Sequence, residues 1–483
     1  LFKNSLADRP SLIPYGPRNG AEVERPVTLA WFAGSDDRVN LTFDVYFGTN
    51  TSSLTKVADD ITTLNYSPGD LVMNTKYYWK VVATDPSGSI TSSVMNFTVK
   101  VAPEWSYDTE YNVNSVAFSA DGEYIAVAGY DPGKVYLFHK DSSTPLWSYT
   151  TGTSVNSVAI SSDGEYITAG GYEGKVYLFD KDSSTPLWSS SHFDTVYSVA
   201  ISSDGEYIVA GSRYDRVYLF GKDSSTPLWN YETGANVASV SISADGEYIA
   251  AGSDDNKVYL FNRDSDAPLW NYTTGNNIAS VDISADGEYI AAVSYDDKVY
   301  FFDKDSSTPL WSYTAGNDVK SVSISADGEY VVAGSEDREV YLFDKDSSTP
   351  LWNYTTGDDV RAIAISADGE YIVVGSNDNK VYFFGKDSST PLWSYVTGNE
   401  VRAVDISVDG EYVVAGSNDD KVYTFENNLA SRPSLIPYGP RSGSNASTSP
   451  QLGWFAGSDD RSNLTFDVYL STSSNPTTKV ADD

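Results

Sequence analysis

Carboxylates are the residues whose number and spacing in this chain could support chemistry. The tetrapeptide Asp-Gly-Glu-Tyr occurs eight times, at steps of 42 and then 41 residues, beginning at Asp121, Asp163, Asp204, Asp245, Asp286, Asp327, Asp368 and Asp409. Acid–base catalysis needs neighbouring groups in different surroundings, so that their pKa values are pushed apart. Near-identical repeats present near-identical carboxylates instead. The pattern therefore predicts a structural role in turns and no catalytic residue.

The amino-acid composition limits the kinds of metal site that this chain can form. The chain has no cysteine and two histidines, His139 and His192, so disulfides, thiolate sites and imidazole clusters are excluded. Aspartates in the variable loops, as in Ser376-Asn377-Asp378-Asn379, are expected to cap turns, and contact with Ca²⁺ is the alternative. We expect no cofactor, with Ca²⁺ as the metal that these aspartates could contact.

One position varies strongly between repeats, where the first predicted strand of each repeat begins. Its residues are Asn114, Asn156, Tyr197, Ala238, Ala279, Lys320, Arg361 and Arg402. The last three repeats each carry a basic residue here, although the chain has a formal net charge of −35. These three residues could contact an acidic glycan or a neighbouring module. The alternative is neutral drift with local charge pairing. The predicted partner-binding residues are Asn114, Asn156, Tyr197, Lys320, Arg361 and Arg402.

Eight Asn-x-Ser/Thr motifs favour export to the cell surface. They are potential N-glycosylation sites at Asn40, Asn50, Asn65, Asn96, Asn271, Asn353, Asn445 and Asn463. The strong negative charge disfavours nucleic acid and anionic membrane as partners. No apolar run reaches 18 residues, so no membrane-spanning helix is expected in this segment.

The elements that position these residues are short and apolar. Within residues 237–276, four apolar stretches cover 237–242, 247–252, 257–261 and 268–273. Four strands in a period of about 41 residues are typical of a β-propeller blade. The third stretch, Val258-Tyr259-Leu260-Phe261, is apolar on both faces, which predicts burial between stacked blades.

The fourth stretch has one copy out of place. Its Pro-Leu-Trp marker places tryptophans at 147, 188, 229, 270, 311, 352 and 393, and counting back from Trp147 reaches Trp105. Residues 103–109 then supply the missing strand and pair within 401–425. We predict an all-β fold with an eight-bladed propeller at residues 101–427, closed by overlapping strands from its two ends, with 103–109 completing the last blade.

The flanking sequence repeats itself. Residues 9–18 recur at 432–441 and residues 31–38 recur at 454–461, both at an offset of 423. We predict β-sandwiches at 6–100 and, as an incomplete copy, at 428–483, with residues 1–5 as the tail of a preceding propeller or a linker. The chain is then expected to be one window of a tandem array. The rival hypothesis is a subunit whose incomplete sandwich is completed by a neighbour.

Three family resemblances follow from particular residues. Thr75-Lys76-Tyr77-Tyr78-Trp79-Lys80-Val81, followed by Ala83-Thr84-Asp85, resembles a fibronectin type III domain, which implies a spacer or adhesive module. The segment from Gly252 to Phe261 resembles the WD40 pattern, with Phe where that family has Trp. The segment from Lys298 to Trp311 is similar to the quinoprotein repeat. This resemblance implies an enzyme with a calcium-bound quinone and a vicinal disulfide, and this chain has no cysteine to form that disulfide.

The leading functional hypothesis is a non-catalytic structural or adhesive extracellular protein. It would be a segment of a tandem array or filament of surface-layer type, with neighbouring copies of the same unit as partners. One alternative is a glycan- or protein-binding module that uses the variable face of the propeller. A second is a quinoprotein-like enzyme.

Overall fold

The computed structural model describes residues 11–34, 41–69, 71–86, 88–191 and 194–427, with short strands at 434–439, 453–457, 468–469 and 479–481. The predicted N-terminal tail at 1–5 and most of the second sandwich at 428–483 lie outside these residues. So do Asn40, His192, Asn445 and Asn463. The chain divides into two compact units, one ending at Ala102 and the other beginning at Pro103.

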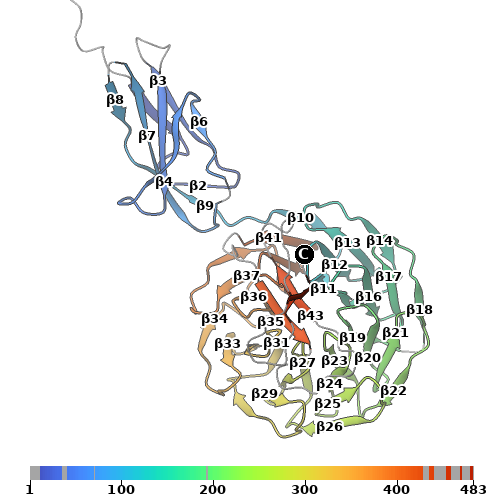
Figure 1. Cartoon of the computed structure of the whole chain (residues 1–483). Helices are drawn as coiled ribbons and strands as arrows, with labels where there is room; N and C mark the ends of the chain where they lie inside the picture. Colours follow the sequence, from blue (N-terminus) through green and yellow to red (C-terminus); the bar gives the residue numbers. More distant parts are fainter. Residues whose placement is uncertain are drawn as a thin grey trace, which may run out of the picture. The chain divides into compact units, whose positions relative to one another are not determined.

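Every regular element of the described residues is a β-strand, which confirms the all-β prediction. None of these residues forms a helix long and apolar enough to cross a membrane. The larger unit repeats a four-stranded antiparallel sheet around a ring, the arrangement of a β-propeller (Figure 1). Four positions recur in each sheet, from the innermost strand to the outermost.

The innermost strands are β11 (Val113–Phe118), β15 (Val155–Ile160), β19 (Val196–Ile201), β23 (Val237–Ile242), β27 (Ile278–Ile283), β31 (Val319–Ile324), β35 (Val360–Ile365) and β39 (Val401–Ile406). The second strands are β12 (Tyr124–Gly129), β16 (Tyr166–Gly171), β20 (Tyr207–Ser212), β24 (Tyr248–Ser253), β28 (Tyr289–Ser294), β32 (Tyr330–Ser335), β36 (Tyr371–Ser376) and β40 (Tyr412–Ser417).

The third strands are β13 (Lys134–His139), β17 (Val176–Asp180), β21 (Arg216–Gly221), β25 (Lys257–Asn262), β29 (Lys298–Asp303), β33 (Glu339–Asp344), β37 (Lys380–Gly385) and β41 (Lys421–Glu426). The outer strands are β10 (Trp105–Asp108), β14 (Trp147–Thr150), β18 (Trp188–Ser190), β22 (Trp229–Glu232), β26 (Pro268–Thr273), β30 (Trp311–Thr314), β34 (Trp352–Thr355) and β38 (Trp393–Val396). The second strands begin one residue later than the sequence predicts.

In seven of these sheets the four strands follow one another in sequence. The remaining sheet combines the first strand of the larger unit, β10, with β39, β40 and β41. In that sheet β10 pairs antiparallel with β41, with Trp105 opposite Thr424 and Asp108 opposite Lys421. Each innermost strand lies against its counterparts in the two neighbouring sheets, and β39 lies against β11. The innermost strands therefore form a closed cycle.

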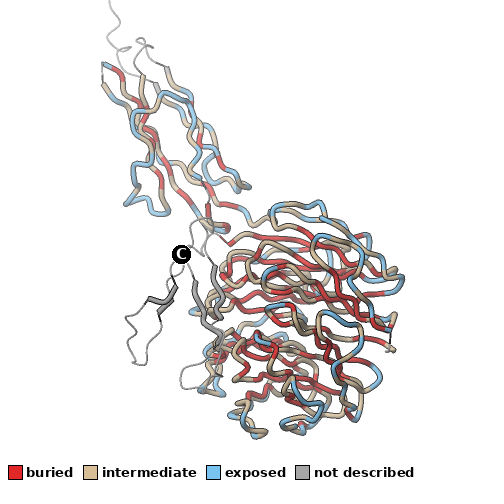
Figure 2. The backbone as a smooth tube through the Cα atoms, turned by 45° about the vertical axis from the view of Figure 1, so that its right-hand side comes forward, coloured by how far each residue is buried: buried red, intermediate tan, exposed pale blue. Residues whose placement is uncertain are grey.

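The third strands are buried on both faces, as predicted for stacked sheets, and the second strands are buried in the same way (Figure 2). The tryptophan of each outer strand packs on the next sheet: the Trp229 and Phe261 ring centroids lie 5.5 Å apart. The Trp229 indole N–H also donates to the carbonyl oxygen of Arg263, at 2.7 Å. Each recurrent Pro-Leu-Trp is thus a side-chain link between sheets.

The Asp-Gly turns join the first and second strands and have the predicted structural role. The Asp245 carboxylate accepts hydrogen bonds from the Ser243 hydroxyl at 2.7 Å and from the Glu247 N–H at 2.9 Å. Gly246 adopts a φ of 69°, in the left-handed region that glycine tolerates best. The repeated carboxylates accept hydrogen bonds within their own turns, which supports their assignment as non-catalytic.

The smaller unit has two sheets. One contains β1 (Ser11–Gly16), β3 (Leu29–Gly34) and β6 (Asn65–Tyr66); the other contains β2 (Ala21–Val23), β9 (Met95–Val99), β7 (Lys76–Asp85), β4 (Thr42–Gly48) and β5 (Thr55–Ile61), with β8 (Gly88–Thr91) paired to β7. Buried Trp31 and Trp79 come from different sheets, and their ring centroids lie 6.5 Å apart. The sheets therefore share an aromatic core.

The remaining strands are β42 (Ser434–Gly439), β43 (Gly453–Gly457), β44 (Val468–Tyr469) and β45 (Lys479–Ala481). The first two pair with each other, as do the last two.

Candidate functional site

The candidate binding residues all follow the first residue of an innermost strand, beside the two loop sets that vary between repeats. These sets are the entries from outer to innermost strands and the loops between second and third strands. We call this the variable-loop face. Asn114 donates to the Val155 carbonyl and Asn156 to the Val196 carbonyl, both at 2.9 Å. These two amides therefore link neighbouring sheets.

The three basic residues are engaged to different degrees. The Lys320 ammonium lies 3.0 Å from Glu336, 3.5 Å from Asp318 and 3.9 Å from the centre of the Tyr295 ring. Only 16% of its side chain is exposed. Lys320 is therefore paired with nearby acidic groups, as the alternative to partner binding predicts for the second residue of an innermost strand. Its use by a partner stays a prediction.

The arginines are more accessible than Lys320. The Arg361 Nε donates to the Asn377 side-chain oxygen at 3.2 Å. The Arg402 guanidinium lies 3.9 Å from Glu400, and 45% of its side chain is exposed. Nearby, burial and then the charges of Glu336 and Asp358 raise the pKa of Asp359. Acidic and basic groups are interleaved over this part of the face, so it offers no simple basic surface.

Exposed tyrosines distinguish another part of the variable-loop face. Tyr130, Tyr172 and Tyr214 occupy the loops between second and third strands in three consecutive sheets and are 49%, 55% and 59% exposed. Tyr197 lies on β19, and partial burial raises its pKa, with Arg213 opposing the shift. We call Tyr130, Tyr172, Tyr197 and Tyr214 the tyrosine surface. Sequence analysis identified only Tyr197 of the four.

A signal for the missed residues was present. The first loop position, held by Tyr130 and Tyr172, carries Arg213, Asp254, Tyr295, Glu336, Asn377 and Asn418 in the later repeats, and the second, held by Tyr214, carries Asp255, Asp296, Asp337, Asp378 and Asp419. Tyrosine there exposes a large amphipathic ring instead. Because the surrounding repeat is nearly constant, such a departure points to a local role.

The expectation of turn-capping aspartates in the variable loops is confirmed. Asp378 accepts from the Tyr382 hydroxyl at 2.5 Å, from the Gly357 N–H at 2.8 Å and from the Lys380 N–H at 3.1 Å. Asp255, Asp337 and Asp419 repeat these bonds to tyrosine and glycine. Their carboxylates fix loop shape, with protein groups already occupying both oxygens.

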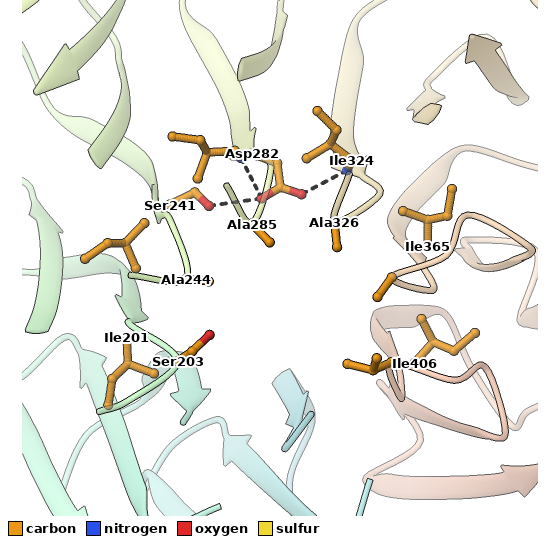
Figure 3. Close-up of a pocket in the computed structure, with 14 residues that line it drawn as sticks. Ile201, Ser203, Ser241, Ala244, Asp282, Ala285, Ile324, Ala326, Ile365 and Ile406 are labelled. Carbon is orange, nitrogen blue, oxygen red and sulfur yellow. Dashed lines mark hydrogen bonds between the residues drawn. The ribbon is translucent and has the colours of Figure 1, made fainter. Parts of the chain in front are cut away.

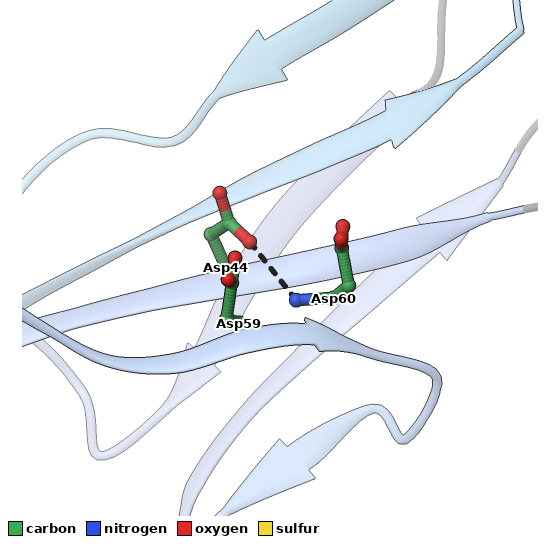
Figure 4. Close-up of side chains that lie close together, drawn as sticks. All are labelled: Asp44, Asp59 and Asp60. Carbon is green, nitrogen blue, oxygen red and sulfur yellow. Dashed lines mark hydrogen bonds between the residues drawn. The ribbon is translucent and has the colours of Figure 1, made fainter.

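One acidic cluster in the smaller unit has metal-like spacing. Carboxylate oxygens of Asp44, Asp59 and Asp60 lie within 4.8 Å of one another (Figure 4). The Lys56 ammonium lies 2.8 Å from both Asp44 and Asp59, and its hydrogen bond to Asp44 is the main cause of the lowered pKa of that carboxyl. An internal cation thus already balances part of this cluster.

The potential glycosylation residues Asn50, Asn65, Asn271 and Asn353 are exposed, and Asn96 is half-buried. Asn353 donates to Glu339 at 2.8 Å, and Asn96 donates to Asn19 at 2.6 Å. Their modification, and a location outside the cell, stay predictions.

Comparison with known families identifies the repeated sheets. A model described as the IFT122 first beta-propeller matches residues 154–425, and one described as WD domain, G-beta repeat matches residues 104–138. No curated protein matches. Among solved structures, Sqt1 from Chaetomium thermophilum, crystallised bound to the N-terminus of the ribosomal protein L10, is 18% identical, with a TM-score of 0.59. The match covers 66% of this chain and 97% of that chain, and at this identity it shows the fold alone.

These matches confirm the WD40 resemblance and correct the functional prediction. The hypothesis of a structural or adhesive extracellular filament is wrong, because the matched family and the similar structure are WD40-type propellers. The sequence suggested it because repetition and sequons accompany many kinds of protein. The quinoprotein-like alternative stays a prediction. WD40 propellers are generally non-enzymatic scaffolds, in agreement with the expected lack of catalysis.

Proposed function

The chain belongs to the IFT122 first beta-propeller family, and from this premise we propose that it is a non-enzymatic scaffold that binds another protein through its variable-loop face. The observation that carries the proposal is the tyrosine surface. Tyr130, Tyr172 and Tyr214 are about half exposed on three consecutive sheets whose framework is nearly constant. Tyrosine supplies large contact area at low cost in side-chain entropy and is enriched at protein interfaces.

The frame supports a rigid binding surface. We propose that the eight four-stranded sheets are the blades of one propeller, which β10 closes by pairing with β41. Sheets joined in a ring hold loops from different blades at fixed separations, so a partner meets a preorganised surface. The smaller unit would be a spacer of fibronectin type III kind. Sqt1, a chain of similar fold, binds the N-terminus of another protein, which supports protein binding as the proposed activity.

Site-specific photo-crosslinking tests the proposal. A crosslinker is placed at Tyr130, Tyr172 or Tyr214, and in matched controls at Leu146, Leu187 or Leu228, which are also about half exposed but lie beside the outer strands. We expect a protein to be captured preferentially from the tyrosine positions. That protein, once purified, should bind Tyr130→Ser/Tyr172→Ser/Tyr214→Ser at least tenfold more weakly. Binding to Leu146→Ser/Leu187→Ser/Leu228→Ser should be unchanged.

Isothermal titration calorimetry of the purified partner with each of the two triple variants measures the two affinities that test the proposal. If both variants bind like the parent chain, or if the leucine variant loses as much affinity as the tyrosine variant, the variable-loop face is not the binding surface.

A further inference from the structure

A pocket lies within the central channel of the propeller, at the end of the innermost strands opposite to the variable-loop face (Figure 3). Its volume is about 250 Å³. The pocket is lined by the last isoleucines of six innermost strands and by residues of the following turns; the isoleucines are Ile201, Ile242, Ile283, Ile324, Ile365 and Ile406. The wall is therefore mainly aliphatic.

The turns around this pocket are joined by backbone hydrogen bonds. The N–H of Ala244 donates to the Ala285 carbonyl at 2.9 Å, that of Ala285 to Ala326 at 3.0 Å, and that of Ala326 to Ala367 at 3.0 Å. Ser162, Ser203 and Val408 extend the same series. This collar ties successive turns together, so the pocket has a preformed rim.

Two repeats carry an aspartate at a position of the innermost strand where the other repeats do not. Asp282 and Asp405 are the next-to-last residues of β27 and β39, and the corresponding positions carry Ala117, Ala159, Ala200, Ser241, Ser323 and Ala364. Asp282 lines the pocket. Both carboxylates thus break the repeat at a site that is otherwise small and neutral.

Neutral groups hold both carboxylates. Asp282 accepts from the Ser241 hydroxyl at 3.0 Å and from the Ile324 N–H at 3.0 Å, as Figure 3 shows. Asp405 accepts from the Phe118 N–H at 2.7 Å and from the Ile406 N–H at 2.9 Å. Across the part of the chain that the structure describes, neither forms an ion pair with lysine or arginine. Two enclosed negative charges therefore lack a protein counter-ion.

We propose that this pocket binds the side chain of a lysine presented by a partner protein. The isoleucine wall would pack on the lysine methylenes, and Asp282 and Asp405 would attract the ammonium group. Enclosed carboxylates are costly unless a cation balances them. The volume is below the roughly 300–1,000 Å³ of drug-sized sites, so it suits a single side chain. This site lies away from the variable-loop face and does not depend on the function proposed for that face.

The electrostatics of the pair support a cation. Burial raises the pKa of both carboxyls to about 6, and the charge of Asp282 contributes to the shift at Asp405. Near pH 7 both groups are mainly ionised and repel each other. An ammonium ion between them would relieve that repulsion.

Binding of n-butylammonium to the full chain, followed by ligand-detected NMR, tests the proposal. The comparison compound is n-butanol, which has the same alkyl chain without the charge. At pH 7.5 we expect butylammonium to bind at least tenfold more tightly than butanol. The variant Asp282→Ser/Asp405→Ala, which introduces residues found at this position in other repeats, should lose at least tenfold. Asp264→Asn removes an acid whose side chain is 81% exposed and should bind as the parent does.

Equal binding of butanol and butylammonium, or undiminished binding by the double variant, would overturn the proposal. If the double variant does not fold, Asp282→Ser alone must weaken butylammonium binding at least threefold. The tyrosine triple variant should retain full butylammonium binding, which separates this pocket from the variable-loop face.

Discussion

Replacing Asp282 and Asp405 is expected to change how the stability of the propeller depends on pH. Both carboxyls have a pKa of about 6 in the folded chain, against an ordinary value of 3.8. The folded state therefore binds more protons than the unfolded state between about pH 4 and pH 6. Stability should fall as pH rises through this window and then level off, because protonation favours the folded state here.

The size of the effect follows from the shift. A rise from 3.8 to about 6 corresponds to about 3 kcal/mol for each carboxyl, at about 1.4 kcal/mol per pKa unit. Because the two groups interact, their contributions do not simply add. The neutral variant Asp282→Ser/Asp405→Ala should thus gain at least about 3 kcal/mol in stability relative to the parent chain on going from pH 4 to pH 7.

Urea denaturation of the parent chain and the variant at pH 4, 5, 6 and 7 measures this difference. The propeller is followed by tryptophan fluorescence, and Asp264→Asn serves as the exposed-acid control. The neutral variant loses hydrogen bonds at every pH, so the informative quantity is the change in the difference with pH. Parallel stability curves for variant and parent would refute the assignment of raised pKa values to these carboxyls.

Two further predictions concern the framework. Trp229→Phe should cost about 1 kcal/mol more than Trp393→Phe in urea denaturation, because the Trp229 indole N–H donates to a carbonyl oxygen whereas that of Trp393 is buried with no hydrogen-bond partner among the described residues; equal costs would contradict a stabilising role for this hydrogen bond. Gly246→Ala should destabilise by about 1–3 kcal/mol, because φ is +69° and the new Cβ would lie 2.7 Å from Tyr207. Gly221→Ala, whose Cβ would meet its nearest neighbour at 3.8 Å, should cost less, and a reversed order in thermal melts would contradict the steric argument.

The sequence predicted the repeated four-stranded sheet because its signals are local. Asp245 and Gly246 specify a reversal within four residues, and Val258 to Phe261 show apolar residues on both faces of a strand. Strand ends were less certain, since Glu247 immediately precedes β24 and is polar like the turn. Turn chemistry and hydrophobic pattern are enough for such elements.

The site depended on contacts that sequence order does not reveal. The sequence predicted that Lys320 could contact a partner. In the structure its ammonium group pairs with Glu336 and lies over the ring of Tyr295, both from nearby loops. The tyrosine surface arises because equivalent loops of consecutive sheets are brought to one face. Asp282 and Asp405 are visible as departures from the repeat, yet only the structure shows that both are buried and that Asp282 lines the channel. Function was hardest to predict, because sequons and repetition do not identify a partner.

The two ends of the innermost strands meet different physical demands. At the Asp-Gly end, the backbones of Ala244, Ala285 and Ala326 hydrogen-bond from sheet to sheet around the channel, which fixes the path of these turns. At the other end, the loops contact solvent, so a repeat can exchange Asp254 for Tyr172 without disturbing the sheets. Variation at the open end can therefore create a specific surface at little cost to the fold. Variation at the collar is confined to side chains that fit the channel, which makes its two carboxylates the more informative departures.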